Sequence, residues 1–409
     1  MSTNNFYTWF WIAYFPLCMA FYKMSWVPNW VDEAMTLLLL GFTALKFRQS
    51  KENSIKNEIW VYIGIMLLYL VYSYIRRVNI IPSVFLDFQQ QVRPYVVFYC
   101  TWLLAPRFTR KQQNYILWGM YATIGLYLLY GGRRSEDVVI GQLCLNCALI
   151  YYLFKPQARR NAIICILIAT LGLLSSKSKY YGEYVVLIAI IYFLKDRLKV
   201  NSLKTGTYVA VLAMVIIYFT WEKFNAYYVQ GFDSESVDYR LARPETYKTA
   251  MTIIFKDYMP LGSGLGTFAT NAAAEYYSPL YYKYNLSNVW GLSPEFNVFM
   301  ADTYYPTLAE YGIVGVFLFL WFWKRRLWAI QKLPLKYYKV GAMAFMALAL
   351  ESVADTSYLS GKGMGYFMLL GIVMSVGTQI ENEKKKIGVN VNDNGKENDN
   401  VSVNVNDSH

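Results

Sequence analysis

The chain has 409 residues, of which 56% are hydrophobic and only 16% are charged, whereas soluble domains carry about a quarter charged residues. Its apolar residues gather in blocks that approach the ~20 residues needed to cross the hydrocarbon core of a membrane as a helix. This composition excludes an ordinary soluble domain and predicts an all-α, polytopic membrane protein. Most of the net charge of +12 lies in alternate connections, which indicates membrane topology rather than a nucleic-acid partner.

The apolar blocks predict about twelve transmembrane helices. The N-terminus lacks the basic region and the small-residue cleavage site of a signal peptide, so the first block is expected to be a retained span. Residues 1–387 then form a transmembrane domain, and the polar, low-complexity segment 388–409 is predicted to be a disordered cytoplasmic tail. In chain order the predicted helices cover residues 6–22, 31–46, 59–75, 94–106, 114–131, 138–154, 161–176, 181–194, 206–221, 302–323, 339–354 and 363–380.

Lysine and arginine are concentrated in alternate connections, such as "KFRQSKENSIK", "KDRLKVNSLK" and "WKRRLWAIQK". Basic connections stay on the cytoplasmic side of a membrane. We therefore expect these connections and both termini in the cytoplasm. The one long connection, residues 222–301, falls on the outer side.

A smaller set of cations remains on the outer side, against this bias. An anionic ligand there would give them a use, because the arginine fork pairs bidentately with phosphate. The alternative is that these side chains snorkel or pair with nearby carboxylates. The outer cations of greatest interest are Arg93, Arg133, Lys177, Lys179, Arg240 and Arg243.

The long outer connection contains an amphipathic stretch. Arg240, Arg243, Tyr247, Met251 and Ile254 recur at spacings of three and four residues, which predicts that they share one face of a helix. Cations at a helix N-terminus oppose the helix dipole, so we expect another group to hold the arginines. The segment is also rich in tyrosine, whose rings suit sugars but also gather at membrane interfaces.

The stretch "PLGSGLGTF" follows, with Gly262, Gly264 and Gly266. It lacks the lysine of a Walker A loop and the spacing of a dinucleotide fingerprint, and no strand precedes it. This excludes a nucleotide loop. The remaining interpretations are a plain tight turn and a nest of backbone N–H groups that holds an anion.

The tenth predicted helix carries two candidate acids. Asp302 stands where an N-cap is expected, and Glu310 lies about 12 Å further along at 1.5 Å per residue. An ionisable group at that depth indicates a functional site, although a buried ion pair with an outer arginine is the alternative. Glu351 and Asp355 are expected to join the same cluster. The only histidine is His409, which excludes a histidine base or metal site in the membrane region.

Several of these motifs resemble those of a known family. "RPETYKTA", "PLGSGLGTF" and "TLAEYGIVGVFLF" are similar in order and spacing to motifs of the bacterial O-antigen and capsule polysaccharide polymerases and the related O-antigen ligases. "FQQQVRPY", with Arg93, and "LLSSKSKYYGEY", with Lys179 in place of an arginine, resemble two further motifs. Ala301-Asp302 stands where the family has histidine and asparagine. Since the ligases are expected to use an outer histidine, this departure favours a polymerase.

The resemblance implies a metal-independent glycosyltransferase of the bacterial cytoplasmic membrane that needs no cofactor. It would transfer a growing glycan from undecaprenyl pyrophosphate to the terminal sugar hydroxyl of another lipid-linked repeat unit on the outer leaflet. Expected partners are that lipid-linked oligosaccharide, membrane lipid, a chain-length regulator and a flippase. The alternatives are an O-antigen ligase acting on lipid A-core, and a flippase or transporter, which the absence of internal repeats disfavours.

The same resemblance implies roles for particular residues. Arg243 would act as a catalytic clamp on the departing pyrophosphate, and Asp302 and Glu310 are the candidates for the base that accepts the hydroxyl proton. Pyrophosphate and sugar would be bound by Arg240, Arg243, Arg93, Lys179, Lys177, Arg133, Tyr247 and Gly264.

Overall fold

A computed structural model describes residues 2–21, 27, 30–50, 52–130, 139–198, 202–230 and 240–394. Within these ranges the chain is helical and contains no β-strand, as the all-α prediction requires. Each predicted span is matched by a helix or by a helix with a short 3₁₀ or π continuation.

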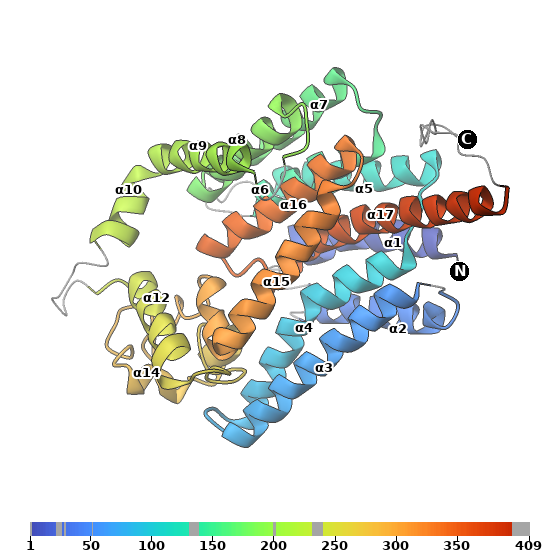
Figure 1. Cartoon of the computed structure of the whole chain (residues 1–409). Helices are drawn as coiled ribbons and strands as arrows, with labels where there is room; N and C mark the ends of the chain where they lie inside the picture. The colour runs from blue at the N-terminus through green and yellow to red at the C-terminus, as the bar shows by residue number, and fades with distance from the viewer. Residues whose placement is uncertain are drawn as a thin grey trace.

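The first half of the chain contributes the following helices to the bundle (Figure 1). They are α1 (Thr3–Tyr14) with its π continuation η1 (Phe15–Ala20), α2 (Val31–Phe47), α3 (Asn53–Arg76), α4 (Ile81–Leu104), α5 (Arg110–Tyr130) and α6 (Val139–Phe154).

The second half adds α7 (Arg159–Thr170) with η2 (Leu171–Ser175), α8 (Ser178–Ile188) with η3 (Ala189–Phe193), α9 (Leu203–Phe219), α15 (Gly312–Gln331), α16 (Leu335–Ala354) and α17 (Gly361–Asn394). α17 packs along α4 and α16, and α6 is buried along almost its whole length among α5, α7 and α16. α17 remains helical into the segment predicted as a polar tail, and residues 395–409 lie outside the described residues.

Two predicted helix starts were wrong. α4 begins at Ile81 rather than at 94, because Asp87, Gln91 and Arg93 make its first half look unlike a membrane span, although all three are buried against neighbouring elements. α15 begins at Gly312 rather than at 302, because the residues before it form a turn and the 3₁₀ helix η7 (Tyr305–Glu310).

Among the described residues, two helices are long and apolar enough to cross a membrane, Asn53–Arg76 and Gly361–Glu383. Shorter apolar helices cover Val139–Phe154 and Leu203–Tyr218. The first of these four exposes large apolar side chains, including Trp60 and Val71 at more than half of their surface. Contiguous exposed apolar surface of this kind marks a face that contacts lipid or another protein.

The connections lie at two ends of the bundle. At the basic end, the Arg107 N–H donates to Asn4 Oδ1 at 2.8 Å, and Arg197 Nη1 donates to the Lys332 carbonyl at 3.4 Å. At the opposite end, which we call the loop end, Asn79 Nδ2 donates to the Gly266 carbonyl at 2.6 Å. Each of these contacts joins segments that the charge pattern assigns to the same side.

The loop end carries the long connection as a folded unit. α10 (Trp221–Phe224) and η4 (Asn225–Gln230) lead into it, and it contains α12 (Ala242–Thr252) with η6 (Ile253–Asp257), α13 (Asn271–Glu275) and α14 (Pro279–Lys283). It has its own apolar core, built around residues such as Ile253, Phe268 and Tyr281. Figure 1 shows α12 and α14 beyond the end of α15.

Candidate functional site

The glycine stretch forms a nest, and the nest is filled by carboxylates of the chain itself. Gly262, Gly264 and Gly266 all have positive φ. The N–H groups of Thr267 and Phe268 donate to Glu310 Oε1 at 2.7 and 2.8 Å. The Gly266 N–H donates to Asp87 Oδ2 at 3.0 Å, and the Gly264 N–H to the Glu310 carbonyl at 3.0 Å. Gly264 therefore offers no N–H to a substrate.

The nest is pressed against the turn that precedes α15. A Cβ atom on Gly262 would lie 2.3 Å from the Gly312 nitrogen, and one on Gly312 would lie 2.3 Å from the Gly262 nitrogen. Only glycine tolerates both this approach and the positive φ of the two residues. The loop and the start of α15 are thus held as one piece.

The predicted surroundings of Glu310 were wrong, because η7 replaces the continuous helix that the depth estimate assumed. Glu310 is fully buried, and so is Asp87, whose carboxyl accepts the Gly266 N–H of the same nest. Neither an outer arginine nor Glu351 and Asp355 join it. Glu310 anchors the nest and is not among the described residues that line the two cavities of this structure.

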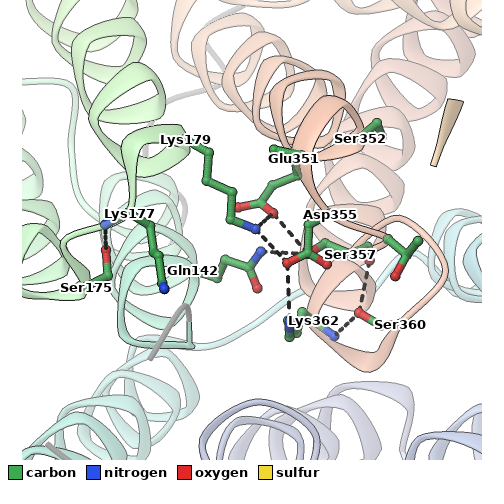
Figure 2. A network of polar contacts seen from close by, with 12 residues as sticks. Gln142, Ser175, Lys177, Lys179, Glu351, Ser352, Asp355, Ser357, Ser360 and Lys362 are labelled. Carbon is green, nitrogen blue, oxygen red and sulfur yellow. Dashed lines mark hydrogen bonds and ion pairs between the residues drawn. The ribbon is translucent and has the colours of Figure 1, made fainter. Parts of the chain in front are cut away.

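Glu351 and Asp355 belong to a separate cluster at the connection between α16 and α17, residues 355–360 (Figure 2). Lys179 Nζ lies 2.5 Å from Glu351 Oε2 and 2.6 Å from Asp355 Oδ2. Lys362 Nζ lies 3.5 Å from the same Asp355 oxygen. Ser357 Oγ donates to Glu351 Oε2 at 3.0 Å, so the connection is tied to α8, α16 and α17 together.

Lys177 and Arg133 complete the predicted cations of this region. Lys177 lies at the edge of the cluster, two residues before Lys179 (Figure 2). Its ammonium makes no ion pair with the residues that the structure describes. Arg133 lies outside the described residues.

Two further predicted cations contact the connection or the last residue of α16 before it. Arg93 is buried, forms ion pairs with Asp32 and Glu33, and donates from Nη1 to the Leu359 carbonyl at 3.0 Å. Arg243, on α12, pairs with Asp302 and reaches the Ala354 carbonyl at 3.5 Å. Asp302 is therefore not a helix N-cap, and that prediction was wrong.

The sequence reasoning did not identify the carboxylate partners of these cations. Arg93, Lys179, Arg240 and Arg243 each have at least one, so the alternative of pairing with nearby acids holds for all four. A usable signal was present for Arg93, because "VDEAM" places adjacent acids at the predicted outer end of the second helix.

A cavity of about 280 Å³ brings three of the predicted residues together beside this connection. Arg240 lies just before α12, so it does not share the helical face predicted for it; its guanidinium pairs with Glu245 at 2.6 Å. Tyr247 is half-buried on α12 and is not part of the lining. The cavity is lined by Tyr227, Arg240, Leu241, Ala242, Arg243, Trp290, Phe299 and Asp302.

The electrostatics of the α16–α17 connection favour ionised Asp355. Burial alone would raise the pKa of its carboxyl, but the Lys362 and Lys179 ammonium groups outweigh burial and lower that pKa to about 2. The carboxylate is thus a fixed negative charge at neutral pH, and it holds two lysines that would otherwise repel each other.

The chemistry available in the cavity follows from its lining. Arg240 and Arg243 present guanidinium groups that suit phosphate oxygens. Asp302 is the one carboxylate among the described residues of the lining; its side chain is 22% exposed, and Arg243 holds it at the wall. The rings of Trp290, Phe299 and Tyr227 offer flat faces for sugar C–H groups. Such a lining can bind an anionic glycan and accept a proton from it.

We predict that Glu310→Gln keeps the free energy of unfolding within about 1 kcal/mol of the wild type, because glutamine can still accept both N–H bonds. Glu310→Ala leaves two buried N–H groups without an acceptor and should lower it by about 3 kcal/mol. Thermal unfolding of both variants in detergent measures the difference. A Glu310→Gln protein that folds normally yet makes no product would instead establish Glu310 as a base.

We predict that Asp355→Asn lowers stability by about 2 kcal/mol at pH 7. Because the pKa of Asp355 is lower in the folded protein, its contribution is complete above about pH 4 and is lost as the pH falls toward 2. The melting temperatures of variant and wild type, measured from pH 7 to pH 2, should therefore converge. Asp196→Asn, at an exposed position on another connection, serves as the control; a gap that is independent of pH contradicts the assignment.

Searches against protein-family models, curated proteins and solved structures give no match to this chain.

Proposed function

We propose that the chain is a polytopic membrane glycosyltransferase that transfers a growing glycan from undecaprenyl pyrophosphate to the terminal sugar hydroxyl of another lipid-linked repeat unit. The observation that carries this proposal is the cavity beside α12. It joins two guanidinium groups, one carboxylate and three aromatic rings, the groups that such a transfer requires.

Placement in a membrane is supported by the apolar helices and by the two ends of the bundle. α3 exposes large apolar side chains over its length, and the contacts between connections join segments of the same predicted side. We propose the bacterial cytoplasmic membrane, with both termini in the cytoplasm and the loop end outside.

The transfer can be written for these residues. The acceptor hydroxyl oxygen attacks the anomeric carbon of the donor sugar, and the bond from that carbon to the pyrophosphate oxygen breaks. The hydroxyl proton passes to the Asp302 carboxylate, and the electron pair leaves with undecaprenyl pyrophosphate. Arg243 and Arg240 stabilise the negative charge that develops on the leaving group.

The pairing of Arg243 with Asp302 gives substrate binding a direct consequence. A pyrophosphate that draws the Arg243 guanidinium toward itself takes that partner away from Asp302. The carboxylate then becomes available to the acceptor hydroxyl at the moment the leaving group is bound. In the absence of the donor lipid, the ion pair with Arg243 keeps the Asp302 carboxylate from accepting a proton.

We predict that Arg243→Ala lowers the rate of polymer formation by about 10²-fold or more, because it removes a donor aimed at the developing charge. Lipid-linked units should still form and cross the membrane but should stay single, which gel analysis of extracted glycolipids detects. Arg76→Ala is the matched control, since Arg76 lies at the same end over the Tyr258 ring and outside the cavity. Polymer of normal length in the Arg243→Ala variant would contradict the proposed role of Arg243 in binding the pyrophosphate.

We predict that Asp302→Asn abolishes chain growth at normal protein abundance, because asparagine keeps the shape of the side chain but accepts no proton. The measurement is polymer length in cells alongside the amount of folded protein in the membrane. Glu295→Gln, which changes an exposed acid of the same unit, should leave the polymer unchanged. Wild-type chain growth from Asp302→Asn would exclude Asp302 as the base.

A further inference from the structure

A second cavity, of about 340 Å³, lies between α3, α4 and α15 and is lined mainly by apolar and tyrosine side chains. Its lining runs along α3 from Ser54 to Tyr69 and along α15 from Gly315 to Arg326. At 1.5 Å per residue these stretches are about 22 Å and about 16 Å long. The cavity is therefore a long, narrow groove, which suits an extended hydrocarbon chain better than a compact ligand.

One end of the groove carries a buried cation with unused donors. Arg326 is 4% exposed and lines the cavity. Its Nη2 lies 2.8 Å from Glu58 Oε2, but its Nε and Nη1 make no hydrogen bond with any residue that the structure describes. The guanidinium lies over the Trp102 ring, 4.8 Å from its centroid, so its position is fixed by packing.

The local charge at this end is positive. Arg325 Nη2 lies 3.0 Å from Glu58 Oε1, so two guanidinium groups share a single carboxylate. Arg325 is half-exposed, at 43% of its side-chain surface, and it also lines the groove. An anion placed here would meet one buried guanidinium and one half-exposed guanidinium.

Leaving two guanidinium nitrogens buried without acceptors costs about 1–3 kcal/mol for each nitrogen. A chain folds around such a group when something supplies the missing acceptors. Phosphate oxygens fit this need best, because they accept parallel hydrogen bonds from the arginine fork. The groove that extends from Arg326 is apolar, so it would accommodate a hydrocarbon chain attached to that phosphate.

We propose that the groove binds one anionic glycerophospholipid, with its phosphate on Arg326 and Arg325 and one acyl chain along α3 and α15. The lining of α15 is about as long as half of the ~30 Å hydrocarbon core, which is the depth of one leaflet. A polyprenyl chain is much longer and would extend beyond the groove. This inference shares the membrane placement of the proposed function but not its transfer chemistry.

The bound lipid has a clear structural role. The far end of the groove is formed by Tyr69 and Tyr311, where the Tyr69 hydroxyl donates to the Tyr311 carbonyl at 2.8 Å. Tyr311 follows Glu310 directly and precedes Gly312, so the acyl chain ends below the turn that holds the glycine nest. A lipid bound in the groove should therefore stabilise the packing of α3 against α15, next to the folded unit of the long connection.

The test uses the full chain, delipidated in detergent and titrated with phosphatidylglycerol. Native mass spectrometry should show one retained phosphatidylglycerol, and phosphatidylcholine should bind at least about tenfold more weakly. Arg326→Gln should weaken phosphatidylglycerol binding by about tenfold or more. Leu318→Trp, which fills the groove, should abolish binding, while the delipidated variant keeps the melting temperature and monodispersity of the delipidated wild type. Arg110→Gln, an exposed arginine at the basic end, is the control.

Equal retention of the two phospholipids by the wild type, or undiminished binding by the Leu318→Trp variant, would overturn the proposal. Preferential retention of undecaprenyl phosphate would overturn the choice of lipid. The outcome is separable from the proposed function, because Arg243→Ala should retain phosphatidylglycerol like the wild type although it makes no polymer. Loss of binding in Arg243→Ala would place the lipid at the other end of the bundle and contradict the groove.

Discussion

The Lys179 ammonium lies between the carboxylates of Glu351 and Asp355, and the loop end of the bundle is organised around that contact. A buried charge is tolerated only with a partner, so α8 cannot move away from α16 without exposing both. The connection that follows α16 is also held by Arg93 through the Leu359 carbonyl. Helices that are far apart in the sequence thus meet at one short segment, residues 355–360.

Glu310 performs the corresponding task for the long connection. Its carboxylate accepts the N–H groups of Thr267 and Phe268, so the chain supplies the anion that its own glycine nest requires. Because Gly262 and Gly312 are in contact at the same turn, the folded unit that follows α12 is fixed to the start of α15. The cavity near α12 can therefore keep its shape although its walls come from a long connection.

The sequence patterns predicted the helical class and the order of the helices, since apolar blocks and basic connections are local signals. They missed the start of α4, because Asp87 and Arg93 are buried by partners that only the tertiary structure provides. They also brought Glu310 to the wrong cluster, because the predicted helix ran through Pro306 and Gly312, which mark η7 and its end before α15. Residue types in the candidate cavity were predictable; their pairing with carboxylates was not.

That pairing changes how the cations act. A guanidinium without a partner would attract any anion. Arg243 is already paired with Asp302, so only a ligand that binds the guanidinium more strongly than a single carboxylate can displace Asp302. Pyrophosphate, with more charge and more acceptor oxygens than a carboxylate, meets that condition. Arg243 also reaches the Ala354 carbonyl, one residue before Asp355. Under the proposed function, a change of partner for Arg243 would therefore occur next to the connection that Lys179, Lys362 and Arg93 hold in place.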